Sequence, residues 1–449
     1  TDGPDNVQSP TGPSAYFLLD GDDTITGAYE PRNKWGDLKG TADVDIVKLG
    51  DGDDLALDFN ERDSVFGGRG DDTVTFMLID RAFSYSTPPH SRAYGEDGND
   101  LLTNANVLIG GAGDDTLVSF SGWTYGGAGN DVYRITHFLH DIIDTEGRSD
   151  IEIHQPDDTY AGRTLRIITG DAKDHIVLDG VNDCIVRTAD RADVVEVNGY
   201  DVTVYAGGGN DTVTGASVVY GANGRDVLSG QFADGGRGND MIDAEQAIGG
   251  AGNDTLSCDT GDGGEGNDSI DARTEGHGGA GDDVMTGRNL YGEDGNDTID
   301  ADGLGHGGAD DDVITGGGRL VGANGDDTLT GDANSDDLLL GGRGADELRF
   351  ALNEGSDVMR GDGGPDTYVL TAFEPSQLPQ FIDTVDSIEG FEHDLDRIDL
   401  RARDGIVAFD DLVIEQVGDF VTIEDAAGYL LVAIVDDNAA NFTADDFVF

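Results

Sequence analysis

The sequence predicts an all-β fold in which the chain winds into a solenoid of stacked, short parallel strands. The first observation behind this prediction is a phrase of the form Gly-Gly-x-Gly-[Asn/Asp]-Asp-x-U-x, where U is a large apolar residue, which occurs thirteen times. Self-similarity of this kind marks repeat architectures whose units stack on their neighbours. The second is the x-U-x ending of each copy, which is typical of a short strand with one inward side chain. The copies begin at residues 67, 95, 110, 126, 206, 221, 235, 249, 263, 278, 292, 307 and 322.

Each copy is expected to form a six-residue turn followed by a three-residue strand. Glycines at positions one, two and four permit positive φ angles and close approach of neighbouring chain segments. Position five is almost always Asn or Asp, the non-glycine residues that best tolerate the left-handed region. Position six is Asp in all of these copies.

The spacing of the copies predicts the size of a coil. Between Asp226 and Asp327 the position-six aspartates recur about every 14 to 15 residues. We expect each such unit to be one complete coil with one wide Gly/Asp turn, one strand, one tight turn and a second short strand. Wide turns would then stack on one edge only. The interval is longer from Asp54 to Asp72 and shorter from Asp337 to Asp346, so the cross-section of the solenoid should change along the chain.

The charge of the chain limits what it can bind. Its 449 residues include 92 acidic and 26 basic side chains, a formal net charge of −66. Nucleic-acid binders need Lys/Arg patches, and no apolar run approaches the roughly 20 residues of a membrane span, so both classes are excluded. Such self-repulsion opposes compaction, and the chain is either disordered or neutralised by a hard divalent cation with oxygen ligands. The regularly placed apolar residues favour neutralisation.

The repeated phrase resembles the RTX (repeats-in-toxin, haemolysin-type) calcium-binding nonapeptide. The resemblance implies a right-handed parallel β-roll in which turns of successive coils hold several Ca²⁺ ions through backbone carbonyls and the position-six Asp. It assigns the ligand role to fourteen residues. These are Asp72, Asp100, Asp115, Asp131, Asp211, Asp226, Asp240, Asp254, Asp268, Asp283, Asp297, Asp312, Asp327 and Asp346.

Calcium and charge together predict a folding mechanism. Without metal, facing aspartates repel one another and the 70 glycines maximise the entropy that folding removes. With metal, the free energy of binding becomes free energy of folding. The chain is expected to be disordered at cytosolic calcium and to fold in millimolar extracellular calcium. This indicates a secreted protein, which could associate with the cell surface.

Composition divides the chain into five segments. We expect a flexible lead-in (1–15), an N-terminal solenoid (16–131) with a loop at 76–92, an irregular insert with few calcium turns (132–205), a regular solenoid (206–370) and a C-terminal β cap (371–449). The cap, with its closing Asp-Asp-Phe-Val-Phe, resembles the C-terminal domain and secretion signal of RTX proteins exported by the type I route. That resemblance implies a type I ABC channel as a partner.

Histidines and cysteines give weaker signals. His137 and His140 could begin a metal site, but no third ligand has a fitting spacing, and ordinary strands are favoured there. His277 and His306 fill a slot that other copies give to tyrosine, which predicts a stacking column. Cys184 and Cys258 should lie several coils apart, beyond the roughly 7 Å limit for a disulfide, so we expect free, buried thiols.

The sequence is compatible with more than one function for this chain. The sequence has no His-Glu-x-x-His, Gly-x-Ser-x-Gly or phosphate-loop motif, which disfavours an enzyme. The first hypothesis is a structural or adhesive calcium-binding protein of the cell surface or a matrix, which could self-associate or bind a surface glycan. The alternative is a carbohydrate-active enzyme (lyase, epimerase or hydrolase) with a site within 132–205. Ice binding would need a flat Thr row, which position three does not provide.

Overall fold

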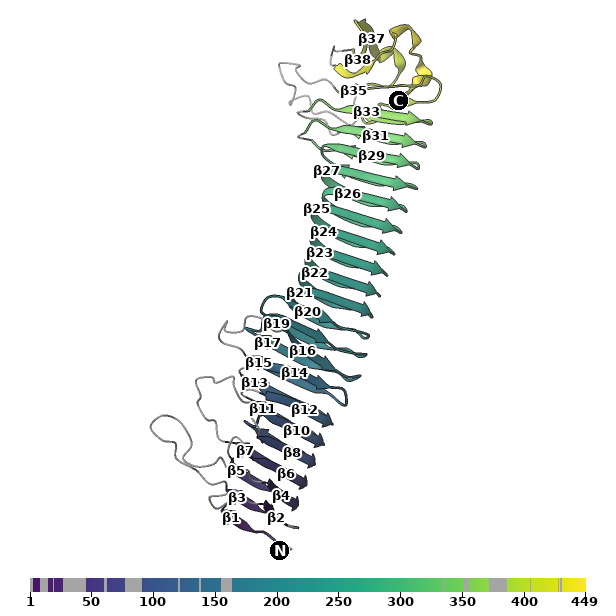
Figure 1. Cartoon of the computed structure of the whole chain (residues 1–449). Helices are drawn as coiled ribbons and strands as arrows, with labels where there is room; N and C mark the ends of the chain where they lie inside the picture. The colour runs from purple at the N-terminus through teal and green to yellow at the C-terminus, as the bar shows by residue number, and fades with distance from the viewer. Residues whose placement is uncertain are drawn as a thin grey trace, which may run out of the picture. The chain divides into compact units, whose positions relative to one another are not determined.

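The computed structural model describes residues 3–8, 15–18, 20–26, 46–59, 63–76, 91–119, 122–136, 139–154, 164–333, 335–350, 355–370, 386–403, 405–426, 428 and 430–449. They form two compact units, Thr1–Ala233 (unit 1) and Asp234–Phe449 (unit 2). The fold is a parallel β-solenoid of about 18 turns, which confirms the fold class (Figure 1). Among the described residues, no helix has the length and apolar character of a membrane span.

Unit 1 is built from two rows of parallel strands. Each even-numbered strand pairs with the next even one, as β4 does with β2 and β6, and the odd strands pair in the same way. The two rows meet at β21, which pairs with both β19 and β20. The strands are β1 (Asn6–Gln8), β2 (Ala15–Phe17), β3 (Thr24–Thr26), β4 (Ile46–Asp51), β5 (Leu55–Phe59), β6 (Ser64–Arg69), β7 (Thr73–Phe76), β8 (Arg92–Asp97), β9 (Leu101–Thr103), β10 (Val107–Ala112), β11 (Thr116–Ser119), β12 (Gly122–Ala128), β13 (Asp131–Ile135), β14 (Leu139–Asp144), β15 (Ser149–His154), β16 (Leu165–Thr169), β17 (His175–Asp179), β18 (Cys184–Arg187), β19 (Val194–Asn198), β20 (Val202–Tyr205) and β21 (Thr212–Asn223).

Unit 2 is also built from parallel strands, and its first coils are narrower. After β22 (Val227–Arg237), which contains the boundary between the units, each coil is a single strand of 11 or 12 residues: β23 (Met241–Ala251), β24 (Thr255–Glu265), β25 (Ser269–Ala280), β26 (Val284–Asp294) and β27 (Thr298–Ala309). The tight turn expected in each coil is a register irregularity inside this strand, for example between Cys258 and Thr260. Such a short coil therefore bends within one strand, and its backbone pairing with the neighbouring coils resumes after the bend.

The coil widens again after β27, which pairs with both β28 and β29. The expected change of cross-section is thus present within unit 2, where the spacing of the aspartates lengthens. The two resulting rows consist of β28 (Val313–Gly316), β29 (Arg319–Asn324), β30 (Thr328–Gly331), β31 (Leu338–Arg343), β32 (Glu347–Phe350), β33 (Val358–Gly363) and β34 (Thr367–Leu370).

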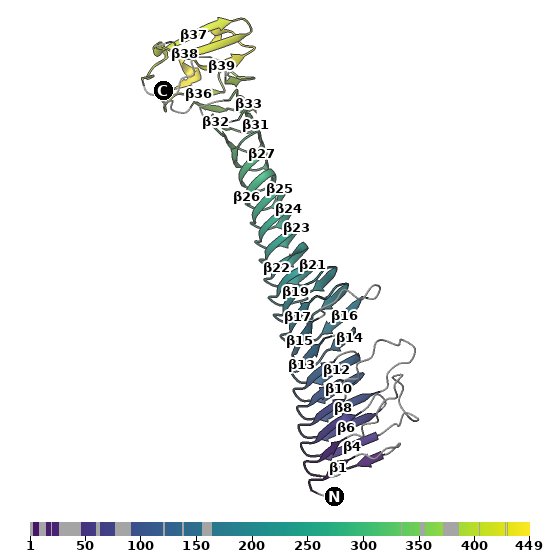
Figure 2. The same ribbon diagram turned by 90° about the vertical axis from the view of Figure 1, so that its left-hand side faces the viewer.

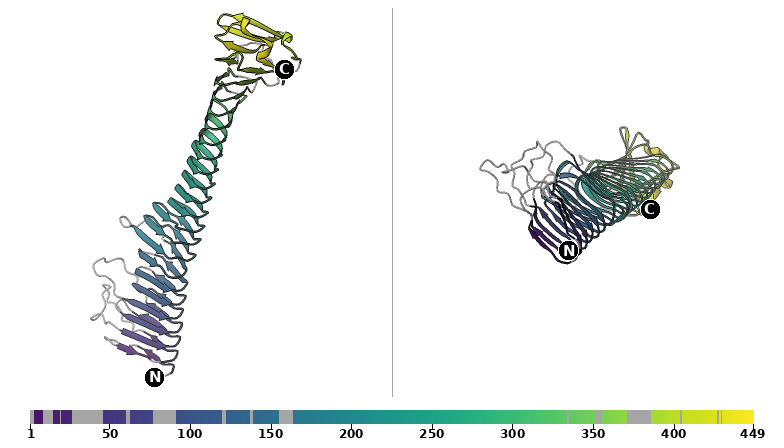
Figure 3. Two further views of the ribbon diagram at one scale, coloured as in Figure 1. Left: turned by 90° about the vertical axis from the view of Figure 1, so that its right-hand side faces the viewer. Right: turned by 60° about the horizontal axis from the view of Figure 1, so that its bottom comes forward.

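The strands are stacked one on another (Figure 3), and their U residues form a column that is the core. Ile242, Leu256 and Ile270 are in register on successive strands and are at most 2% exposed. Burying one such side chain contributes about 1.5–3 kcal/mol, and a coil holds only a few of them, so each coil depends on its neighbours. Cys184 and Cys258 are buried and free, as predicted.

A small β structure covers the C-terminal end of the solenoid in unit 2 (Figure 2). β35 (Ser387–Ile388) pairs with β33 and β39, and β36 (Arg397–Asp399) pairs with β34 and β40. Antiparallel strands complete it. They are β37 (Leu412–Val417), β38 (Phe420–Asp425) and β39 (Leu430–Val435), with β40 (Phe447–Val448) and the 3-10 turns η2 (Phe409–Asp411), η3 (Ala439–Asn441) and η4 (Ala444–Asp446).

Two segment assignments from the sequence differ from the structure. Residues 6–8 of the supposed flexible lead-in form β1, which pairs with β3, so the first coil begins there. The stretch 132–205 is not irregular in its strands, because β13 to β20 pair in the same two parallel rows. The predicted loop falls mostly on residues 77–90, which lie outside the described residues, as does His137.

Candidate metal-binding turns

The wide turn of each coil has a fixed backbone shape, well represented by residues 249–254. Positions two and four have positive φ, 107° at Gly250 and 136° at Gly252. Position two keeps this shape even without glycine, as at Glu96 with φ of 80°. Position five does not have a positive φ, since Asn253 is not among the residues that do. The expectation that Asn and Asp occur at position five because they tolerate the left-handed region is therefore wrong.

Position five is used for a hydrogen bond between coils. The amide N–H of Asn253 donates to Oδ1 of Asn239 in the coil before it, at 3.1 Å, and the N–H of Asn267 donates to Oδ1 of Asn253 at 3.2 Å. Asn and Asp are the short side chains whose oxygen can accept such a bond close to the backbone. A polar column therefore follows the exposed side of the turns.

Position six forms a second column that runs in the opposite direction. The N–H of Asp240 donates to Oδ1 of Asp254 in the coil after it, at 2.7 Å, and the N–H of Asp254 donates to Oδ1 of Asp268 at 2.7 Å. All fourteen predicted aspartates are at most 2% exposed. The two columns together tie each wide turn to the turns on both sides of it.

The other carboxylate oxygen of position six points at the first glycine of its own turn. A Cβ placed on Gly249 would lie 2.5 Å from Oδ2 of Asp254 and 2.6 Å from the carbonyl oxygen of Gly263 in the next coil. No side chain fits, and the two oxygens face the same place. The same arrangement recurs at Gly67, where the distances are 2.1 Å to Asp72 Oδ2 and 2.6 Å to the Gly95 carbonyl.

These Oδ2 atoms are buried and accept no hydrogen bond among the described residues. A buried oxygen without a partner is uncommon in native proteins and is often explained by an ion. Of the predicted ligands, the atoms with this property belong to Asp72, Asp100, Asp115, Asp131, Asp211, Asp254, Asp268, Asp283, Asp297, Asp312, Asp327 and Asp346.

The buried column is electrostatically unfavourable as bare carboxylates. Burial raises the pKa of Asp72 to about 8, with further increases from the charges of Asp100 and Asp54, although the N–H of Asp54 lowers it. Burial likewise raises the pKa of Asp312 to about 8 and that of Asp254 to about 6. A cation beside these oxygens would reverse the effect, because an opposite charge favours the ionised carboxylate.

The turns fit a hard divalent cation. One orphaned carboxylate oxygen and one carbonyl oxygen of the next coil face the same place at the turns that begin at Gly67, Gly95, Gly110, Gly249, Gly263, Gly278, Gly292 and Gly322. Ca²⁺ prefers such oxygen ligands. Within the described ranges, no three His, Cys, Asp or Glu side chains converge on a metal position. Most ligands would therefore be backbone carbonyls, in agreement with what the RTX resemblance implies. Bound calcium would supply the positive charge that the aspartate column lacks.

Nine further aspartates make the same inter-coil contacts, and sequence reasoning did not give them a ligand role. Their turns depart from the full glycine pattern but keep Asp followed by an apolar residue two positions later, which is the signal that could have found them. They are Asp23, Asp54, Asp174, Asp193, Asp337, Asp357, Asp366, Asp386 and Asp396.

Asp337, Asp357 and Asp386 of unit 2 form a separate column. The N–H of Gly318 donates to Oδ1 of Asp337 at 2.7 Å, the N–H of Asp337 to Asp357 at 2.8 Å, and the N–H of Asp357 to Asp386 at 3.3 Å. This column accompanies the widening of the coil after β27. The wider coil therefore has aspartate turns on two edges.

One predicted site has competing protein partners. After Asp131 the next coil has Ser149 in the aspartate position, and the Asp131 N–H donates instead to the Arg148 carbonyl at 2.7 Å. Oδ2 of Asp144 accepts from the Tyr133 hydroxyl and from Ser149 Oγ, both at 2.9 Å. These contacts occupy the place of a second aspartate, so the Asp131 turn fits a cation least well of the fourteen.

The histidines outside the turns have structural partners. His277 stacks on Tyr291 with ring centroids 4.8 Å apart, and Tyr291 contacts His306 at 6.2 Å, which confirms the predicted stacking column. Half-exposed His154 lies 2.8 Å from Glu152 and 3.1 Å from Asp179 on the outer face of β15 and β17. The side chain of His140 is not described.

Comparison with known families gives one match. A family model described as the RTX calcium-binding nonapeptide repeat (4 copies) matches residues 39–74, 102–123, 188–217, 243–257, 289–303 and 319–348. The matched segments fall in both units and include wide turns described above. No curated protein matches the chain.

Proposed function

We propose that this chain, which carries RTX calcium-binding nonapeptide repeats, is an extracellular, non-enzymatic protein that folds when calcium binds. It would then serve as a structural or adhesive element of a cell surface or matrix. RTX repeat proteins are typically secreted. The C-terminal β structure would act as the type I secretion domain, and the chain would pass the ABC channel unfolded at cytosolic calcium.

The column of buried, orphaned Oδ2 atoms is the observation that supports this proposal best. In the metal-free chain these atoms are desolvated without compensation, and a buried polar atom left unpaired costs about 1–3 kcal/mol. Repeated over successive coils, this cost opposes folding until a cation binds. Calcium would then link neighbouring turns and offset part of the net charge of −66.

Circular dichroism with calcium, magnesium or a chelator tests the proposal. We expect a β-sheet spectrum in about 2 mM calcium, a range typical of extracellular modules, and loss of that spectrum after chelation. Magnesium should not replace calcium, because it demands a tighter octahedral shell and dehydrates reluctantly. A β spectrum unchanged by the chelator would contradict calcium-dependent folding.

The carbohydrate-active alternative has less support. The side chains that could act as acid and base within 132–205, such as His154 with Glu152 and His175 with Asp150, pair with one another and are about half exposed. Ion pairs on an open sheet face are a sufficient explanation for them. A screen for glycan cleavage by the calcium-loaded protein, repeated with His154→Ala, would reveal an activity at this place.

A further inference from the structure

The outer face of the even row in unit 1 has few acidic side chains along its whole length. In nine of its strands, from β4 to β21, two outward positions that are in register between the strands hold eighteen residues, none of which is Asp or Glu. Since 92 of 449 residues are acidic, about four would be expected by composition. The eighteen, called the acid-free face, are Ile46, Lys48, Ser64, Phe66, Arg92, Tyr94, Val107, Ile109, Trp123, Tyr125, Arg166, Ile168, Ile185, Arg187, Thr203, Tyr205, Val218 and Tyr220.

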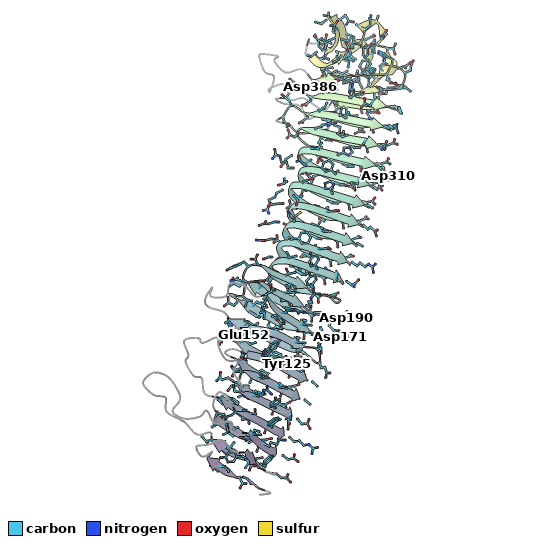
Figure 4. All side chains as sticks on the ribbon, in the orientation of Figure 1. Tyr125, Glu152, Asp171, Asp190, Asp310 and Asp386 are labelled. Atoms are coloured by element: carbon cyan, nitrogen blue, oxygen red, sulfur yellow. The ribbon has the colours of Figure 1, made fainter. Side chains whose placement is uncertain are left out.

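The acid-free face is apolar as well as acid-free, and Tyr125 marks it in Figure 4. Twelve of its residues are aromatic or aliphatic, and none is buried. Ile46 is 43% exposed and Trp123 37%, and two neighbours in the same row, Phe17 and Ile143, are 66% and 41% exposed. β14, where the register shifts, adds Asp141, and exposed acidic residues also stand at the ends of β4 and β8, namely Asp51, Glu96 and Asp97. By contrast, the strands β24 and β25 of unit 2 carry Asp262 and Glu275 on the corresponding side.

The aromatic rings of this face are stacked on one another. Phe66 and Tyr94 are parallel with centroids 4.5 Å apart, and Tyr205 and Tyr220 are 5.0 Å apart. The Arg187 guanidinium lies 4.3 Å from the Tyr205 centroid. Because neighbours cover the ring faces, a sugar that needs an open ring face would fit poorly. The ring edges and aliphatic side chains are what the face offers to a partner.

We infer that the acid-free face pairs with the acid-free face of a second copy of this chain, as two sheets packed face to face. Elsewhere on a chain with a net charge of −66, close approach of another copy brings carboxylates together. The outward side of the odd row is poor in acids only as far as β13, and β15 and β19 carry Asp150, Glu152 and Glu196 there. Eleven strands at about 4.8 Å, each presenting about 13 Å of width, give about 650 Å² per copy. The total of about 1,300 Å² lies within the range of specific interfaces.

This inference goes beyond the proposed function but rests on its calcium-dependent folding. Analytical ultracentrifugation of the full chain in calcium tests it, with circular dichroism on the same samples. We expect a species of about twice 47.0 kDa at tens of micromolar protein. Added sodium chloride should strengthen the pairing, since it screens the repulsion between two acidic chains.

Two matched variants locate the interface. Ile46→Asp, at 43% exposure on β4 of the acid-free face, should raise the dissociation constant at least tenfold, because each pair carries the new charge twice. Val284→Asp, at 52% exposure on β26 of unit 2, should leave it within about twofold. Both variants should keep the β spectrum in calcium.

Three results would overturn the inference. One is a folded protein that stays monomeric at high concentration in calcium, and another is an equal loss of pairing in both variants. The third is a monomer that binds polygalacturonate or anionic vesicles in a salt-sensitive way that Arg92→Glu abolishes, which would assign the face to an anionic ligand. A chain without β structure in calcium would instead refute the proposed function, and the inference with it.

Discussion

Replacing Asp268 by Asn separates the two roles of a position-six side chain. Asn keeps the Oδ1 that accepts from the Asp254 N–H at 2.7 Å, but it removes the charge and the orphaned Oδ2. Burial raises the pKa of Asp268 to about 6 from its ordinary 3.8. That rise corresponds to at most about 3 kcal/mol of unfavourable free energy in the ionised, metal-free fold at neutral pH. Asp268→Asn should therefore stabilise the metal-free solenoid while weakening its response to calcium.

Urea unfolding followed by circular dichroism measures both effects, in calcium and in metal-free buffer with an osmolyte that strengthens burial. We expect Asp268→Asn to require more calcium for half-folding and to be more resistant to urea without metal. Asp271→Asn is the matched control, because it removes the same charge from an exposed outward position of β25, the strand that follows Asp268. If both variants lower stability equally, or if Asp268→Asn leaves the calcium midpoint unchanged, Oδ2 of Asp268 does not face the ion.

Three further predictions concern sterics, protons and stacking. Gly249→Ala should destabilise the calcium-loaded fold by more than about 2 kcal/mol in urea, because its Cβ would meet two oxygens within 2.6 Å, whereas Gly363→Ala, with 3.7 Å of room, should not. Lowering the pH from 8 to 4 should stabilise the metal-free fold in circular dichroism: the folded-state pKa of Asp72 is about 8, the folded state binds more protons than the unfolded chain over this window, and the gain is lost as the pH rises through 8. Tyr291→Ala should cost about 0.5–1.5 kcal/mol in urea unfolding through the lost contact with His277, and an unchanged midpoint would show that the stacking column contributes nothing.

The parts of the fold that the sequence predicted depend on rules local to one coil. An inward U residue such as Leu256 follows from strand alternation, and the buried place of Asp254 follows from its fixed slot in the turn. The narrow coils from β23 to β27 follow from the short spacing of their position-six aspartates. Each of these features repeats, so a single chain carries many examples of it.

The features that the sequence did not predict depend on contacts between coils. Asn253 looks like a residue chosen for its backbone conformation, and only the register of neighbouring turns shows that its side chain accepts a hydrogen bond. Asp337 and Asp357 lack the glycine context, and their column becomes visible only when the coil widens. The acid-free face gathers residues from strands far apart in sequence, and no local pattern indicates that they share one surface.

Anomalous diffraction from crystals grown in calcium tests the central claim most directly. The account predicts an ion peak bounded by Oδ2 of Asp254 and the carbonyl oxygen of Gly263, with equivalent peaks at the other turns that have this arrangement. An ordered solenoid in saturating calcium with no ion peak beside these two oxygens would contradict it.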